Sequence, residues 1–465
     1  MHPIDARIAA VLPAGTLYAV GGRVRDEIRA ELEGTQRPSA ADSDYLVVGL
    51  PLPVLMEHLR PLGRVDEVGA SFSVLKLTVE GQTVDVAVPR RERSVGAGHR
   101  DFVVESGPDV TLEEDLRRRD FRMNMLARAL PSGEIVDPYA GQADIRAHRI
   151  DIVTPASFEE DPLRMLRAAQ FAARFEYAVT PKTQTAMTQA APLVRTVSPE
   201  RVHDELIKLL GARKPSIGLV LLEETSVLAQ LWPELVEGVG VEQNEWHAYD
   251  VWRHSLATLD ATLPGDLSLR LSALLHDIGK PRTKEGPHFY RHEIVGAAMA
   301  RSMLERFRFP NAAVEATEHL VRQHMYSADP SLSDAGLRRF IRRVGVENIE
   351  RLFALRHADI AGSGLPKRDG GNEAFETRVR AELARRPAFS IRELAINGDD
   401  VIAALVARGD APAEYRGDAR VGAALQWLFE QVTDVPERNE RSLLLNILEQ
   451  YLSAADSVAS QERIS

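Results

Sequence analysis

Residues 19–32 read AVGGRVRDEIRAEL and contain an apolar run, two adjacent glycines and a charged segment with apolar residues at helical spacing. The apolar run predicts a β-strand, and the segment after the glycines predicts a helix that carries Arg23 and Arg25. Glycines let the backbone approach a ligand closely, and a helix N-terminus favours an anion. Many strand–Gly-Gly–helix units bind nothing, so this stretch alone predicts an α/β domain but no function.

The next predicted strand begins with two acids, Asp42 and Asp44, in the sequence DSDYLVVG. Side chains two residues apart on a strand point to the same side, and neighbouring carboxylates repel unless a cation lies between them. Oxygen ligands of this kind select Mg²⁺ or Mn²⁺. Asp85, in the alternating segment TVDVAV, is a candidate third carboxylate on a neighbouring strand. The alternative is that these acids are solvated.

The order of these features is the order that nucleotidyl transfer requires. A glycine turn can hold a triphosphate, while metal ions on an acid pair activate the attacking hydroxyl and stabilise the leaving pyrophosphate. We therefore predict catalytic roles for Asp42, Asp44 and Asp85, with Mg²⁺ bound by Asp42 and Asp44.

The composition is that of a globular chain. It has 465 residues, which predicts two to four domains, and it has no apolar run of transmembrane length. The cysteine count is zero, which excludes a disulfide-linked partner and fits a reducing, cytoplasmic location. The start of the chain is too polar for a secretory signal. The net charge of −11 argues against indiscriminate coating of nucleic acid but permits a local basic groove.

Strand signals are confined to the first part of the chain. The segments TLYAVGG, SDYLVVG, FSVLKLTV and QTVDVAV predict strands from their β-branched and aromatic content. From about residue 146 onward, helical periodicity replaces them. We therefore predict an α+β protein, with an α/β head followed by a long helical part.

Residues 159–171, EEDPLRMLRAAQF, place Asp161, Arg164 and Arg167 at steps of three beside an apolar seam. The spacing predicts one helical face that carries an acid and two arginines. Taken alone, such a face is typical of a solvated surface with intrahelical ion pairs. The motifs around it change that interpretation.

Five segments occur in the order seen in bacterial tRNA nucleotidyltransferases, a class that also includes bacterial poly(A) polymerases. They are VGGRVRD, DSD, RRDFRMNML, DPYAGQADI and EEDPLRMLRAAQFAARF. The segment at residues 90–121 resembles the CCA-adding enzymes in particular. The resemblance covers residues 17 to about 210, and its specificity comes from the combination of motifs.

The resemblance implies template-independent addition or repair of the 3′-terminal CCA of tRNA from CTP and ATP. It implies that Asp42 and Asp44 bind Mg²⁺. Gly22 and Arg25 would contact the incoming nucleotide, and Arg118 its triphosphate or sugar.

In that family the helix after the head reads the incoming base, and the chemistry of this sequence supports such a role. Asp161 can accept a hydrogen bond from the amino group of cytosine or adenine, while Arg164 donates to the adjacent ring nitrogen. Uracil and guanine present a carbonyl and a ring N–H there, so both would be rejected. Arg167 continues the face. Gln170 stands where the family usually carries another arginine, so that charge is missing.

Residues 89–115 hold Gly96 and Gly98 among several charges and predict a mobile loop. In the family a flexible loop here helps the switch from C to A addition, and enzymes that add only C lack much of it. Its presence favours an enzyme that also adds A.

The second half of the chain carries a set of histidines and aspartates around the sequence LLHDIGKPRTK. A His-Asp pair before Gly-Lys resembles the HD superfamily of metal-dependent phosphohydrolases. The resemblance implies an inner metal site of His254, His276, Asp277 and Asp359, with His292 and His324 as candidate ligands of a second ion. Mn²⁺, Ni²⁺, Fe²⁺ and Mg²⁺ suit such ligands. Some HD relatives show phosphatase, 2′-nucleotidase or 2′,3′-cyclic phosphodiesterase activity, whereas isolated core histidines are the alternative.

We expect a nucleotidyltransferase head at 1–145, a helical neck at 146–215, an HD-type body at 216–365 and a tail at 366–465. Body and tail would hold the tRNA acceptor and elbow by shape and phosphate contacts. Two alternative functions remain: a poly(A) polymerase or A-only enzyme of the same class, and an HD phosphohydrolase whose head only binds RNA. The sequence predicts no oligomeric state.

Overall fold

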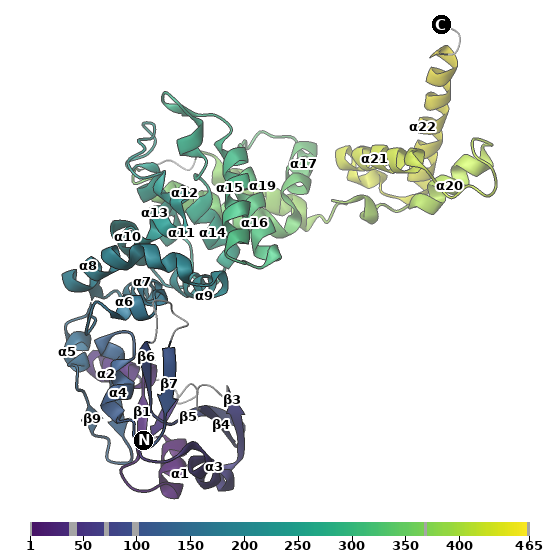
Figure 1. Ribbon diagram of the computed structural model, residues 1–465. Coiled ribbons are helices and arrows are strands. Elements are labelled where there is room, and N and C mark those ends of the chain that lie inside the picture. Colours follow the sequence, from purple (N-terminus) through teal and green to yellow (C-terminus); the bar gives the residue numbers. More distant parts are fainter. Residues whose placement is uncertain (1, 37–43, 69–73, 95–101, 367–369, 463–465) are drawn as a thin grey trace.

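The computed structural model describes residues 2–36, 44–68, 74–94, 102–366 and 370–462. Figure 1 shows an arched molecule with the strand-containing head at one end, a helical body in the middle and the tail at the other end. The tail helices are α20 (Gly398–Ala407), α21 (Ala419–Asp434) and α22 (Arg441–Glu462). The predicted α+β class, with a mixed head before a long helical part, is confirmed.

The head is built on a seven-stranded sheet in the order β3-β4-β5-β2-β1-β8-β9. Its strands are β1 (Leu17–Val20), β2 (Asp44–Val47), β3 (Arg64–Val68), β4 (Val74–Val79), β5 (Gln82–Ala87), β8 (Ala127–Ala129) and β9 (Ile135–Val136). β2 and β5 run parallel, and the other neighbours in this sheet run antiparallel. The four predicted strands are β1, β2, β4 and β5, whereas shorter or more polar strands gave no sequence signal.

The two faces of the sheet have different coverings. Three helices contribute to the large core on one face: α1 (Pro3–Val11), α2 (Gly22–Glu33) and α3 (Leu52–Leu59). On the other face a small cluster joins Leu46 of β2 to Leu116 of α4 (Leu112–Arg117). Because side chains alternate along a strand, Asp44 lies on the same face as Leu46. Asp44, which we predicted to bind a metal ion, therefore lies on the less covered face.

Part of the segment predicted to be a loop is ordered structure. β6 (Arg90–Ser94) pairs with β7 (Phe102–Ser106) as an antiparallel hairpin, and α4 follows it. The prediction of a loop over 89–115 is wrong for these residues, because pairing between charged strands leaves little sequence signal. Gly96 and Gly98 lie outside the described residues.

Helices dominate the rest of the chain, with two short sheets between them. β10 (Arg149–Ile150) pairs with β11 (Ala178–Val179) in the neck, and β12 (Lys284–Glu285) pairs with β13 (His288–Phe289) in the body. The neck helices are α6 (Ser157–Glu160), α7 (Leu163–Phe175), α8 (Pro181–Ala190), α9 (Pro199–Leu210) and α10 (Ser216–Glu224). We had predicted an entirely helical neck, and the strands β10 and β11 show that it is not. The apolar seam of α7 is buried, as predicted from Leu163, Leu166 and Phe171.

Gly218 lets α10 lie directly against α7. A Cβ atom at this position would lie 2.4 Å from the carbonyl oxygen of Ala169 and 2.5 Å from Leu209 Cδ1. We expect Gly218→Ala to destabilise the protein by about 1–3 kcal/mol, because two helix backbones must separate. Gly422→Ala is the matched control, since a Cβ at that helical glycine meets nothing within 4 Å. The midpoint of thermal unfolding should fall for the first variant and stay or rise for the second.

The body and the tail have separate cores. The body helices include α13 (Val251–Asp260), α14 (Leu267–Leu275), α15 (His292–Arg306), α16 (Asn311–Gln323), α17 (Asp334–Val344), α18 (Ile349–Gly362) and α19 (Asn372–Ala384). Phe375 of α19 packs on Phe340 and Phe353 inside the body core, while the tail core starts at Ala388. Packing therefore places α19 in the body, later than our expected boundary at residue 366.

A buried arginine fastens the tail to the body. Arg338 of α17 donates to the carbonyl oxygens of Thr433 and Asp434 at the end of α21, and to Glu382 of α19. These contacts satisfy the last carbonyls of α21 with a cation, which stabilises a helix C-terminus.

Among the described residues, the helices are all too short or too polar to cross a membrane.

Candidate functional site

The Gly-Gly turn joins β1 to α2 at the floor of a cavity. Gly21 has φ +72°, a conformation that favours glycine, and a Cβ atom there would lie 2.9 Å from a guanidinium nitrogen of Arg119. No side chain caps α2, so backbone N–H groups at its N-terminus remain to face a ligand. The turn can therefore bind an anion.

Asp44 begins β2 and is the register partner of Asp85 on the parallel strand β5. Equal register on neighbouring strands puts both carboxylates on the same face of the sheet. Two oxygen-bearing side chains at one place are a donor set that fits Mg²⁺. Asp44 lines the cavity, whereas Asp85 lies outside its lining. Asp42 lies outside the described residues.

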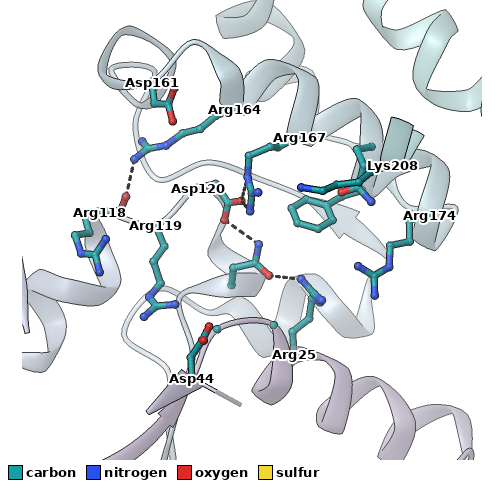
Figure 2. Close-up of a pocket in the computed structure, with 15 residues that line it drawn as sticks. Arg25, Asp44, Arg118, Arg119, Asp120, Asp161, Arg164, Arg167, Arg174 and Lys208 are labelled. Carbon is teal, nitrogen blue, oxygen red and sulfur yellow. Dashed lines mark hydrogen bonds and ion pairs between the residues drawn. The ribbon is translucent and has the colours of Figure 1, made fainter. Parts of the chain in front are cut away.

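One cavity of about 600 Å³ brings together all of the predicted nucleotide-binding residues (Figure 2). Its wall comprises Gly21, Gly22, Arg25, Asp44, Arg118, Arg119, Asp120, Asn124, Asp161, Arg164, Arg167, Gln170, Phe171, Arg174 and Lys208. Arginine and lysine outnumber aspartate seven to three in this wall, so its field favours an anion. The volume is that of a small-molecule site.

Asp120 orients two of the cavity's arginines, and sequence reasoning missed it. Its carboxylate accepts from Arg167 Nε at 2.8 Å and from the Asn124 amide at 2.8 Å. Asn124 accepts from Arg25 at 2.7 Å. Burial alone would raise the pKa of Asp120, but Arg167 holds that pKa below its usual value. Asp120 therefore stays charged and keeps Arg25 and Arg167 in fixed positions.

Asp115 does the same for Arg118 and Arg119. Its buried carboxylate lies 2.8 Å from Arg118 Nη2 and 3.2 Å from Arg119 Nη2. Arg118 was predicted, whereas Arg119 and Lys208 were not. The RRD motif could have indicated Arg119, but Lys208 reaches the cavity from α9 only through tertiary packing.

Asp161 and Arg164 line the same cavity, but they do not share a helix (Figure 2). α7 begins at Leu163, and Asp161 precedes it in an extended conformation. The predicted continuous face is therefore wrong at Asp161, because a proline, Pro162, disfavours helical geometry in the residue before it. Asp161 accepts from Leu163 N–H at 3.2 Å and from Arg201 at 2.9 Å.

Arg164 is buried rather than solvated, which excludes the alternative of a solvated face at this position. Its guanidinium donates to the hydroxyl and carbonyl of Ser157, to Glu160 and to the carbonyl of Arg118. These contacts fix its direction at the edge of the cavity.

Four histidines of the body turn the same ring nitrogen toward one another. The Nδ1 atom of each histidine lies 2.6–3.2 Å from a backbone carbonyl oxygen. The carbonyl belongs to Gly362 for His254, to Ala273 for His276, to Phe289 for His292 and to Val321 for His324. A carbonyl only accepts, so each Nδ1 carries the proton and each Nε2 presents a lone pair. Two Nε2 pairs then face each other at 3.1 and 3.2 Å. Buried lone pairs so close together fit a bound cation.

Asp277 lies between the two histidine pairs. Its Oδ2 is 3.2 Å from His276 Nε2 and 3.5 Å from His254 Nε2. Its Oδ1 is 3.4 Å from His292 Nε2 and 3.7 Å from His324 Nε2. The residues form potential ligand sets on either side of this carboxylate. His254, His276 and Asp359 on one side, and His292 and His324 on the other, would hold a divalent cation, with an oxygen of Asp277 available on each side.

Three further side chains surround this centre. Asp359 Oδ1 lies 3.2 Å from His254 Nε2 and forms a potential ligand set with His254 and His276. Lys280 Nζ donates to Asp277 at 2.6 Å. His247, which sequence reasoning missed, forms another potential ligand set with His254 and Asp277.

Three family models match the chain in succession. The "Poly A polymerase head domain" matches residues 17–151, and the "Probable RNA and SrmB- binding site of polymerase A" matches residues 176–238. The HD domain matches residues 251–360. The first model covers the cavity's glycine turn and Asp44, and the third covers the histidine centre.

Curated relatives match nearly the whole chain. A protein named "Multifunctional CCA protein" in Nitrosococcus oceani is 35% identical over 427 residues, which cover 88% of this chain and 98% of the relative. The chain belongs to the CCA protein family. Its namesake in Xanthomonas campestris pv. campestris matches with the same identity and coverage. Membership of the CCA protein family makes this chain a nucleotidyltransferase with an HD domain.

Solved structures of the CCA protein family agree with this assignment. The CCA-adding enzyme of Bacillus stearothermophilus in complex with CTP is 25% identical, with a TM-score of 0.68 over 98% of this chain and 100% of that one. The Thermotoga maritima CCA-adding enzyme complexed with tRNA shares the fold at 18% identity and a TM-score of 0.53, covering 96% and 94% of the two chains.

Proposed function

We propose that this protein adds or restores the 3′-terminal CCA of tRNA from CTP and ATP, without a nucleic-acid template. One observation carries the proposal: the N-terminus of α2, Asp44 and the Asp161–Arg164 pair all face a single cationic cavity. That cavity offers a triphosphate site, a metal-binding carboxylate and a base-reading pair together. The printed names of the relatives, and the CTP complex of a similar enzyme, support the same activity.

In the proposed reaction the 3′ hydroxyl oxygen of the tRNA bonds to the α-phosphorus of the nucleotide, and pyrophosphate leaves. Divalent ions held by Asp42 and Asp44, which we propose to be Mg²⁺, would promote loss of the hydroxyl proton and neutralise the leaving group. The N-terminus of α2 and the Arg118–Arg119 pair bind the triphosphate as negative charge moves onto pyrophosphate. Asp85 is proposed to support the metal-binding face.

The base is proposed to be chosen by Asp161 and Arg164. A carboxylate acceptor beside a guanidinium donor matches the amino group and ring nitrogen of cytosine and adenine. Arg167, held by Asp120, would position the nucleotide rather than identify it. The contacts of Arg164 with Ser157 and Arg118 supply the rigidity that such selection needs.

Extension of a tRNA that lacks CCA, with each nucleotide supplied singly, tests the function. We expect incorporation from CTP alone, incorporation from ATP only after two C residues, and none from UTP or GTP. Incorporation of A without C would favour the poly(A) or A-only enzymes. If the intact protein hydrolyses phosphate esters but extends no tRNA, the result would favour an HD phosphohydrolase whose head only binds RNA.

A second activity is favoured by the buried histidine centre. We propose that His254, His276, Asp277 and Asp359, with His292 and His324, bind one or two divalent ions, Mn²⁺, Ni²⁺ or Mg²⁺, and hydrolyse phosphate esters at RNA 3′ ends. Removing a 3′-phosphate or opening a 2′,3′-cyclic phosphate would regenerate the hydroxyl that the head extends.

The body and tail are proposed to hold the tRNA acceptor and elbow.

The double variant His276→Ala/Asp277→Ala should lose phosphohydrolase activity and spare nucleotide addition, because the two sites share no residue. It should also lose the rise in thermal midpoint that added Mn²⁺ gives the wild type, since a metal that binds only the folded state stabilises it. His58→Ala, on α3 of the head, is the control. Metal-dependent stabilisation that survives the double variant would contradict the proposed ligands.

A further inference from the structure

Three guanidinium groups surround one phenyl ring beside the nucleotide cavity. The central guanidinium carbons of Arg25, Arg29 and Arg174 lie 4.7, 4.3 and 5.0 Å from the centre of the Phe175 ring. The aromatic face attracts each cation, but the cations repel one another at this spacing. Such a cluster concentrates positive charge at one point of the fold.

The acids around this cluster do not balance it. All three arginines share Asp26. Its two carboxylate oxygens accept hydrogen bonds from Arg25 at 2.8 and 2.9 Å. Arg29 and Arg174 lie farther from this carboxylate, at 4.0 and 3.8 Å. Glu33 pairs with Arg29. Arg174 is thus the least neutralised of the three. Burial, and then repulsion from Arg25, lowers the pKa of Arg174, and the attraction of Asp26 does not offset these effects.

Arg174 and Arg25 both line the cavity. Figure 2 shows Arg174 beside Lys208, on the side of the cavity away from Arg118. Arg174 is half exposed, whereas Gln170, one helical turn earlier on α7, is buried and neutral. Among the cavity-lining residues of this turn of α7, Arg174 is the one that presents a charge to the solvent-filled space.

We propose that Arg174, together with Arg25, forms a phosphate-binding subsite at the end of the cavity away from Arg118, and that it supplies the charge that Gln170 lacks. This inference rests on the proposed function, since the phosphate belongs to one of its substrates. The phosphate comes either from the backbone of the RNA 3′ strand or from the triphosphate of the incoming nucleotide. Both present the same negatively charged oxygens to the guanidinium groups.

Direct binding of each substrate separates these sources without relying on catalysis. The wild type, Arg174→Ala and Arg213→Ala are compared for the dissociation constants of tRNA lacking CCA and of CTP with Mg²⁺. Arg213 is an exposed arginine paired with Glu176, outside the cavity lining, and should change neither constant. We expect Arg174→Ala to weaken the binding of either tRNA or CTP by about 10- to 100-fold. This is the effect of losing a charge-assisted hydrogen bond.

The salt dependence identifies an RNA phosphate. If the phosphate belongs to RNA, Arg174→Ala should lose about one phosphate contact. The slope of log tRNA affinity against log salt concentration should then become shallower by about 1. If it belongs to the nucleotide, only CTP binding should weaken. The double variant Gln170→Arg/Arg174→Ala should recover part of the loss, since it places a cation one turn away on the same wall.

Unchanged binding of both substrates by Arg174→Ala would overturn the subsite. Wild-type protein that binds tRNA and CTP but fails to extend would instead overturn the proposed function. The two failures are therefore distinguishable.

Discussion

Asp44→Asn should lower CCA addition by a factor on the order of a thousand or more while leaving the protein folded. Metal-ion catalysis contributes several kcal/mol to such a reaction, and each 1.36 kcal/mol is a factor of about ten in rate. Asp44 is exposed at the start of β2, so an isosteric amide removes the proposed metal ligand without opening the core. The measurement is single-turnover incorporation of C into tRNA lacking CCA, at saturating CTP.

Asp66→Asn is the matched control for this experiment. Asp66 is also a strand residue of the head, but it lies on β3 and pairs with Arg64 away from the cavity. Its variant should extend tRNA as the wild type does. The proposed phosphohydrolase activity should also persist in Asp44→Asn, because the histidine centre lies in the body. Incorporation by Asp44→Asn within tenfold of the wild type would remove the metal assignment.

Asp161→Ala should reduce the preference for CTP over UTP by about ten- to a hundredfold, because a base-reading pair is worth about 1–3 kcal/mol. The amino group of cytosine loses its acceptor, and the carbonyl of uracil no longer faces a negative charge. The effect should appear in the ratio of incorporation efficiencies more than in the rate with CTP alone. That ratio is measured on tRNA lacking CCA.

The structure adds a complication that the controls resolve. Asp161 also accepts from the Leu163 N–H at the start of α7, so alanine removes a helix contact as well as an acceptor. Asp161→Asn keeps an oxygen for that contact but offers a donor to uracil, so it should lose selectivity with less loss of stability. Glu159→Ala removes an exposed acid of the same segment that lies outside the cavity lining. An unchanged CTP-to-UTP ratio in both Asp161 variants would exclude this residue from base selection.

Local patterns predicted the parts of the fold that depend on neighbouring residues. Alternation in QTVDVAV predicted β5, and the Gly-Gly turn predicted the strand-to-helix connection at Gly21. Short or charged strands such as β6 and β9 left no such pattern. The extended conformation of Asp161 could have been predicted from Pro162, but helical spacing on the other side of the proline concealed it.

The candidate sites divide in the same way. The family resemblance indicated Arg25, Arg118 and Arg164, and the cavity brings them together. It did not indicate that Asp120 holds Arg167, because those residues are 47 positions apart and meet only when α7 packs on the head. Lys208 reaches the cavity for the same reason, from α9.

The sequence by itself determined the chemistry of this protein: which acids, arginines and histidines are present, and in what order. It also determined which of these side chains share a face of one strand or helix, because local spacing controls that arrangement. Only the tertiary structure decided that Asp277 faces both histidine pairs and that three arginines meet around Phe175. Those contacts join distant segments, and they depend on which apolar faces pack together, a choice that no single segment encodes.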